Sequence, residues 1–147
     1  MAKVVETANQ IVVALPQARV AELYTCHDLL PSWSPGLLSF EPLCDGTPTS
    51  TPRFKQRYLA MGMEIEEILT VVDNNLPHDV CVVADNGGTL TRESKIIFEP
   101  IDETSTRLRV GNRFSGEYAQ HLVKQTLYDY TQQFLETFKA FAESRLT

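Results

Sequence analysis

Residues 115–146, "SGEYAQHLVKQTLYDYTQQFLETFKAFAESRL", constrain the fold of this chain more strongly than any other segment. The segment contains no proline, and its only glycine is Gly116, near its start. Its apolar residues recur at steps of three and four, the spacing of one helix face: Val123, Leu127, Tyr130, Phe134, Phe138 and Phe141. Ser115 is placed to cap such a helix, and Glu117 to meet its dipole in the first turn. The segment therefore predicts one long amphipathic helix.

Upstream of this helix, the chain from residue 37 onward is a series of strand-like runs. The runs alternate or are rich in β-branched and aromatic residues, and turn-forming residues separate them, Asn86-Gly87 most clearly. The expected strands are 37–44, 53–60, 63–73, 79–85, 90–101 and 106–114. Connections this short predict an antiparallel meander.

The first 36 residues predict one more strand and short helical segments. The strand is expected at residues 3–15, which are rich in β-branched residues and end before Pro16. The next segment, 17–26, has the apolar spacing of a helix. The segment 29–36 contains too many prolines for more than a turn or a short helix. The fold class is thus α+β: a seven-stranded antiparallel sheet whose apolar face the long helix covers. The length of 147 residues and the lack of repeats or linkers predict a single domain over 1–147.

Composition narrows the range of partners. The formal net charge of −6 and pI near 5.0 argue against nucleic acid and anionic membranes as partners. No apolar run approaches the roughly 18 residues of a membrane span. The apolar N-terminal stretch is interrupted by Glu6, Asn9 and Gln10, with no small-residue cleavage site after it, so we expect a cytoplasmic location. Nothing in the sequence decides between a monomer and a homodimer.

The cysteines and histidines do not form a metal-binding pattern. Cys26, Cys44 and Cys81 are odd in number and unlike a disulfide framework, so we expect reduced thiols. Cys26-His27 and the His78–Cys81 pair lie far apart and lack the close pairs that are typical of zinc sites. We expect no metal and no cofactor.

Three motifs carry a resemblance to a known superfamily: "VVALPQARVAELY" (12–24), "LLPSWSPG" (29–36) and "EPLCDGTPTSTPRFKQRY" (41–58). With the order of elements, they resemble the START/Bet v 1-like superfamily, which includes polyketide cyclase/dehydrase and lipid-transport-like proteins. The resemblance extends from about Val4 to Glu143. It implies a helix-grip fold, in which a curved seven-stranded sheet wraps around the C-terminal helix and two short helices separate the first two strands.

The resemblance implies binding or transport of a small, mostly apolar ligand, such as a lipid, polyketide or aromatic compound, between sheet and helix. One alternative is an enzyme like the polyketide cyclases and dehydratases. Those cyclases use inward arginine and tyrosine side chains on central strands, which strand 63–73 lacks, and this departure weighs against the enzyme. A second alternative is a chaperone-partner-like interaction module whose cavity is vestigial.

Strand parity indicates which side chains face such a cavity. Two strands divide clearly into an inner and an outer face, and their inner residues include Phe54, Gln56, Tyr58, Leu108, Asn112 and Phe114. Tyr58, Tyr130 and Asn112 are either hydrogen-bonding points for a carbonyl or hydroxyl of the ligand, or buried groups paired with backbone or water. Leu127 and Phe134 add apolar surface from the helix.

Four further candidate residues have an ambiguous position. Arg92 shares a face with apolar residues, and Glu67 is an acid on an apolar face, where either a bulge shifts the register or the side chain reaches the cavity mouth. His121 is a candidate general base, although we expect it in water at the helix edge. Trp33 either closes one end of the cavity or forms wall that a ligand touches, and we favour closure.

Overall fold

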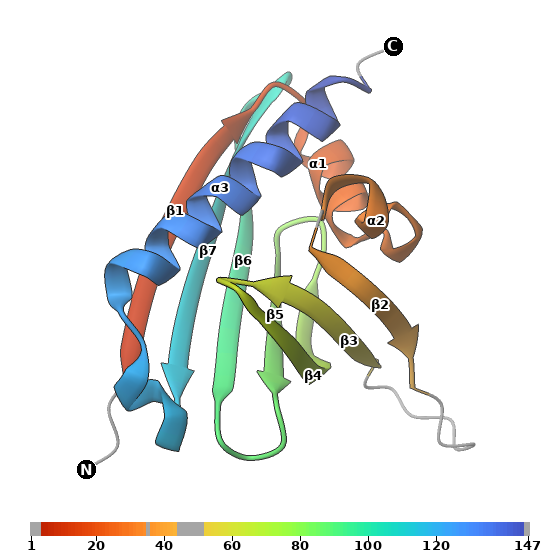
Figure 1. Cartoon of the computed structure of the whole chain (residues 1–147). Coiled ribbons are helices and arrows are strands. Elements are labelled where there is room, and N and C mark those ends of the chain that lie inside the picture. The colour runs from red at the N-terminus through yellow and green to blue at the C-terminus, as the bar shows by residue number, and fades with distance from the viewer. Residues whose placement is uncertain (1–3, 35, 44–51, 146–147) are drawn as a thin grey trace.

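The computed structural model describes residues 4–34, 36–43 and 52–145. Seven strands form one antiparallel sheet, as the sequence predicts, and their order is β1-β7-β6-β5-β4-β3-β2 (Figure 1). Their bounds are β1 Val5–Val13, β2 Leu37–Pro42, β3 Arg53–Ala60, β4 Met63–Asn75, β5 Asp79–Asp85, β6 Thr91–Asp102 and β7 Ser105–Ser115. Strands β2 to β7 form the expected meander, and β1 pairs with β7.

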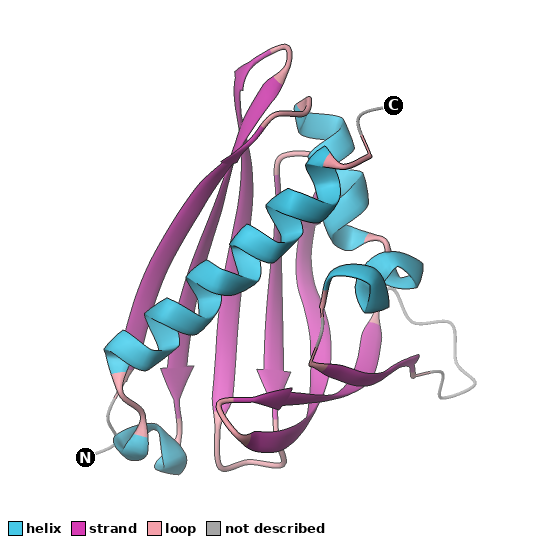
Figure 2. Ribbon diagram, turned by 45° about the horizontal axis from the view of Figure 1, so that its top comes forward, coloured by secondary structure: helices cyan, strands magenta, loops and turns pink. Residues whose placement is uncertain are grey.

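The long helix α3 (Lys124–Glu143) crosses the concave face of the sheet (Figures 1 and 2). Hydrogen bonds fix it to the edge strand β1: Asn9 Nδ2 donates to the Tyr128 carbonyl at 3.1 Å, and Lys139 Nζ donates to the Val12 carbonyl at 2.6 Å. Its buried side chains are Leu127, Thr131, Leu135, Phe138 and Ala142. The helix therefore lies closest to β1, and the sheet curves away from it toward β2.

The prediction that this helix begins at Ser115 is wrong. Ser115 ends β7, and Gly116 turns the chain with φ 108°, a conformation that favours glycine. A 3-10 helix, η2 (Glu117–His121), follows, and extended backbone at Val123 separates it from α3. Val123 itself is 61% exposed, so it does not belong to the buried face of α3.

Three short helical elements connect β1 to β2, in agreement with the predicted short helices. They are α1 (Gln17–Thr25), the 3-10 helix η1 (His27–Leu29) and α2 (Leu30–Trp33). Side chains of α1 fill one end of the space under α3, where Val20 and Leu23 join Leu108 and Phe138 in the main core. Side chains of α1 do not fill the rest of the space between the concave face and α3. Among the described helices, none has the length and apolar character needed to cross a bilayer.

Candidate functional site

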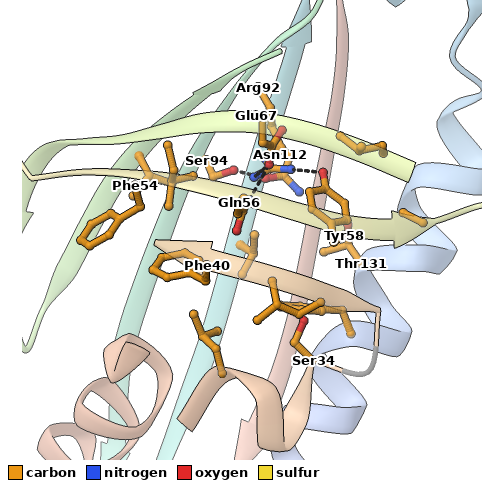
Figure 3. A pocket seen from close by; sticks show the side chains of 18 of the residues that line it. Ser34, Phe40, Phe54, Gln56, Tyr58, Glu67, Arg92, Ser94, Asn112 and Thr131 are labelled. Carbon is orange, nitrogen blue, oxygen red and sulfur yellow. Dashed lines mark hydrogen bonds and ion pairs between the residues drawn. The ribbon is translucent and has the colours of Figure 1, made fainter. Parts of the chain in front are cut away.

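A cavity of about 890 Å³ lies between the concave face of the sheet and α3. Its floor comes from the central strands and is mostly apolar, through Val82, Ile96 and Val110. Its roof comes from α3, and the short helices close one end (Figure 3). The cavity exists because α3 packs on β1 at one edge of a sheet that curves round in front of it at the other edge. Side chains alone do not fill the space between them.

Most of the residues that the sequence places at the cavity do line it: Trp33, Phe54, Gln56, Tyr58, Glu67, Arg92, Asn112, Phe114, Leu127, Tyr130 and Phe134. Leu108 and His121 are not among the lining residues. Leu108 has the expected inward parity, but it is fully buried in the main core, at the end of β7 that α1 covers. His121 is exposed and lies beside the Tyr118 ring, with the ring centroids 5.5 Å apart.

Four side chains in the cavity form a hydrogen-bonded group, which we call the polar cluster: Gln56, Tyr58, Glu67 and Arg92 (Figure 3). Arg92 Nη2 donates to Glu67 Oε1 at 3.0 Å, and Arg92 Nη1 donates to the Tyr58 hydroxyl at 3.2 Å. Gln56 Nε2 donates to the same Glu67 oxygen at 2.6 Å. Arg92 and Glu67 thus both point inward, which resolves the two ambiguous positions.

Strand register explains how the polar cluster forms. Gln56 and Glu67 are direct cross-strand partners on β3 and β4, with no bulge between these strands, so the alternative of a shifted register does not apply. Arg92 lies on β6, and β5 separates it from β4. Its partner on β5 is Ala84, whose methyl group leaves space for the guanidinium to extend across β5 toward Glu67.

The charges of the polar cluster cancel. Burial lowers the pKa of Arg92, but the Glu67 carboxylate and the Tyr58 hydroxyl outweigh burial, so this pKa is raised overall and the guanidinium stays charged. Burial raises the pKa of Tyr58 to about 12, although Arg92 acts in the opposite direction. Burial also raises the pKa of Tyr130. The cluster therefore pairs the charged Arg92 guanidinium with the Glu67 side chain, next to the neutral Tyr58 hydroxyl.

Two further parts of the lining contain residues that were not predicted from the sequence. The first is polar: Ser94 Oγ donates to Oδ1 of the predicted Asn112 at 2.6 Å on the floor, and Thr131 faces the cavity from α3. The second part is aromatic: the His27 ring lies 4.3 Å from the Phe54 ring and 5.0 Å from the Phe40 ring. Burial lowers the pKa of His27, which keeps this ring neutral.

The aromatic residues and the polar cluster lie in sequence along β3. Phe54, Gln56 and Tyr58 alternate with outward residues on this strand, so Phe54 and Tyr58 are about 13 Å apart along it. Figure 3 shows Phe40 and Phe54 on one side of Gln56, with Tyr58 and Thr131 on the other. One elongated molecule in the cavity would therefore meet both apolar rings and polar groups.

Trp33 closes one end of the cavity. It is 2% exposed and packs against the rings of Tyr24, Phe134 and Phe138, with centroids 4.8 to 5.3 Å apart. Its indole also borders the cavity, and Nε1 has no hydrogen-bond acceptor among the described residues. Trp33 therefore has both of the expected positions: it closes one end of the cavity, and its indole is also part of the cavity wall.

Buried tyrosines predict a loss of stability at alkaline pH. Burial raises the pKa of Tyr24 and Tyr58 from 10.0 to about 12. Between these values the unfolded chain loses the protons and the folded chain keeps them, so the free energy of unfolding falls as pH rises. One unit of pKa corresponds to about 1.4 kcal/mol, so the shift of Tyr24 by about two units accounts for a fall of about 3 kcal/mol, which Tyr24→Phe should remove. Urea denaturation at several pH values measures the fall, and Tyr128→Phe, at an exposed tyrosine, is the control. Equal pH profiles for Tyr24→Phe and Tyr128→Phe would contradict the prediction.

Within the described part of the chain, no group of three or more His, Cys, Asp or Glu side chains is arranged to hold a metal ion. Cys26 and Cys81 are free thiols. Cys44 lies outside the described residues.

Comparisons with known proteins show the fold. No family model matches the sequence, and no curated protein matches it. The aromatase/cyclase Zhui from Streptomyces sp. R1128 superposes with a TM-score of 0.78 at 13% identity, over 99% of this chain and 97% of that chain. A START superfamily protein from Mycobacterium smegmatis gives 0.72 at 15% identity, over 96% of both chains. Norcoclaurine synthase from Thalictrum flavum, solved in complex with dopamine and hydroxybenzaldehyde, gives 0.71 at 12% identity, over 99% of this chain and 90% of that chain. The chain therefore has the helix-grip fold of START/Bet v 1-like proteins, as the sequence resemblance predicts.

Proposed function

We propose that this protein binds one small, mostly apolar molecule in the cavity between the sheet and α3, and carries or stores it. The observation that carries the proposal is the cavity itself, whose volume of about 890 Å³ is within the usual range of about 300–1,000 Å³ for ligand pockets. Its walls are mostly apolar, and burial of apolar ligand surface against them contributes about 25 cal/mol per Å². The polar cluster would orient the ligand.

A second candidate is an enzyme of the cyclase or dehydratase type. It is favoured by one observation, the inward Arg92–Tyr58 pair at 3.2 Å. These residues supply an inward arginine and tyrosine from β6 and β3, although β4 has neither. A neutral Tyr58 hydroxyl is a proton donor to a carbonyl oxygen, which such chemistry requires. An interaction module with a vestigial cavity is less well supported, because the cavity is of ligand size.

We propose a cytoplasmic location, as the N-terminal sequence suggests, and the free, half-buried thiols of Cys26 and Cys81 support a reducing compartment. Lipid transport is one form of the proposed function. It requires no membrane span, only a cavity that takes up and releases an apolar chain.

Native mass spectrometry tests the proposed function. We expect the purified protein to retain one small molecule above the mass of its 16.6 kDa chain, or to take up one from a panel of uncharged apolar compounds. Denaturation of the same sample should release the molecule, which shows that it is bound noncovalently. A carrier releases the molecule unchanged, whereas an enzyme releases a product of different mass. A bare chain in every sample, before and after incubation with the panel, would contradict binding.

A further inference from the structure

We infer that Glu67 sets the charge preference of the cavity: it neutralises Arg92, so that the site accepts an uncharged ligand bearing a hydrogen-bond acceptor oxygen and disfavours carboxylates and sulfonates. This inference rests on the proposed binding function and adds the chemical class of the ligand to it. It makes Glu67 a specificity-determining residue rather than only a structural one.

The first step is that Arg92 and Glu67 are the formally charged side chains inside the described cavity. The other ionisable residues of its lining are Glu64 and Glu66, at the border, apart from the neutral His27 and the tyrosines. The Glu64 and Glu66 carboxylates are more than half exposed and pair with Lys55 and Arg57 on the outer side of the sheet. The charge that a bound ligand meets is therefore set by one ion pair.

The second step is that this pair is closed within the protein. The Glu67 side chain is 7% exposed, and its Oε1 accepts both Arg92 Nη2 and Gln56 Nε2. An anionic ligand at Arg92 would have to lie beside the Glu67 carboxylate in a site largely shielded from water. Two negative charges in direct contact with the same guanidinium and away from water repel each other strongly. A ligand with no charge meets no such penalty.

The third step is that the polar cluster still offers a donor. The Tyr58 oxygen accepts the hydrogen bond from Arg92 Nη1, so its own proton remains available to an acceptor in the cavity. The raised pKa of Tyr58, caused first by burial, keeps that proton in place at neutral pH. The arrangement suits a ketone, ester or hydroxyl oxygen on an otherwise apolar molecule.

Two fluorescent probes with the same ring skeleton test the charge preference that this inference assigns to Glu67. N-phenyl-1-naphthylamine is uncharged, and 8-anilino-1-naphthalenesulfonate adds one sulfonate. We expect wild-type protein to bind the uncharged probe at least about tenfold more tightly. Glu67→Gln retains the shape and the Oε1 acceptor but leaves Arg92 unbalanced, so it should shift the ratio of the two dissociation constants toward the sulfonate by about tenfold or more, a change of about 1.4 kcal/mol. Since both probes are measured on the same variant, a lower folded fraction does not change the ratio.

Matched variants provide the controls. Glu93→Gln removes an exposed carboxylate from the outer face of β6, next to Arg92 in sequence, and should leave the ratio unchanged. Arg92→Met, which leaves the Glu67 carboxylate unbalanced, should shift the ratio the other way. The double variant Glu67→Gln/Arg92→Met should restore the ratio close to wild type, and it remains informative if either single variant folds poorly.

The outcomes separate the two proposals. If wild type binds the uncharged probe but Glu67→Gln and Arg92→Met both keep the wild-type ratio, the inference about Glu67 is wrong and the binding function stands. If the double variant departs from wild type as far as Glu67→Gln does, the pair does not act through charge balance, and the inference is again wrong. If wild type binds neither probe and also stays a bare chain in every native mass spectrometry sample, the proposed function fails and the inference fails with it.

Discussion

Arg92→Met is expected to lower the free energy of unfolding by about 3 kcal/mol at pH 7. Breaking a buried ion pair by removing one partner costs about 3–5 kcal/mol, because the remaining charge is buried without compensation. We expect the lower end of this range, since the Arg92 side chain keeps 21% of its surface exposed, toward the cavity. Glu67→Gln should have a similar effect, because it leaves the guanidinium unbalanced.

The double variant Arg92→Met/Glu67→Gln should recover most of this loss and lie within about 1 kcal/mol of wild type, since replacing both charges of a buried pair is often close to neutral. Urea denaturation of the four proteins forms a double-mutant cycle. The exposed pair Arg107–Glu99, with both side chains 38% exposed, is the control, and its single variants should each cost less than about 1 kcal/mol. The account is contradicted if the losses at Arg92 and Glu67 simply add in the double variant.

The architecture was predictable because its signals are local. The period of the apolar residues in α3, the alternation in β7 and the turn at Asn86-Gly87 each depend on residues close together in the sequence. Alternation also placed Phe54, Gln56 and Tyr58 on the inner face of β3, where they line the cavity.

The start of α3 was not predictable from the same signals. A run without proline and with good helix formers continues upstream of Lys124, but a Cβ atom at Gly116 would lie 2.7 Å from the Thr89 carbonyl oxygen. That close approach is a tertiary contact, and it fixes the sharp turn after β7. The expectation that Leu108 lines the cavity was wrong for a related reason. Strand parity gives the face on which a residue lies, but not which part of that face another helix covers.

The orientation of Arg92 and Glu67 could not be predicted from either residue alone. Each is a charge on an apolar face and is ambiguous when taken alone, and 25 residues separate them in sequence. A buried charge requires a partner, so two such positions of opposite sign on strands of one sheet are a signal for an inward ion pair. His27 gave no comparable signal, because it lies in a short 3-10 helix between α1 and α2, where neither period applies.

Thr131→Trp is expected to weaken binding of N-phenyl-1-naphthylamine by roughly tenfold to a hundredfold. Thr131 is 9% exposed and faces the cavity from α3 (Figure 3). An indole at this position would project into the space that the ligand needs, and overfilling a packed site costs about 1–3 kcal/mol. Thr126→Trp makes the same change on an exposed part of the same helix that does not line the cavity, and should leave binding unchanged.

The ratio of the dissociation constants of Thr131→Trp and Thr126→Trp for the uncharged probe, from fluorescence titration of the two folded proteins, tests the central claim most directly. Binding inside the cavity predicts a ratio of about ten or more, at a stoichiometry of one probe per chain for wild type. A ratio close to one, with wild type binding the probe, would place the ligand outside the cavity and contradict the account.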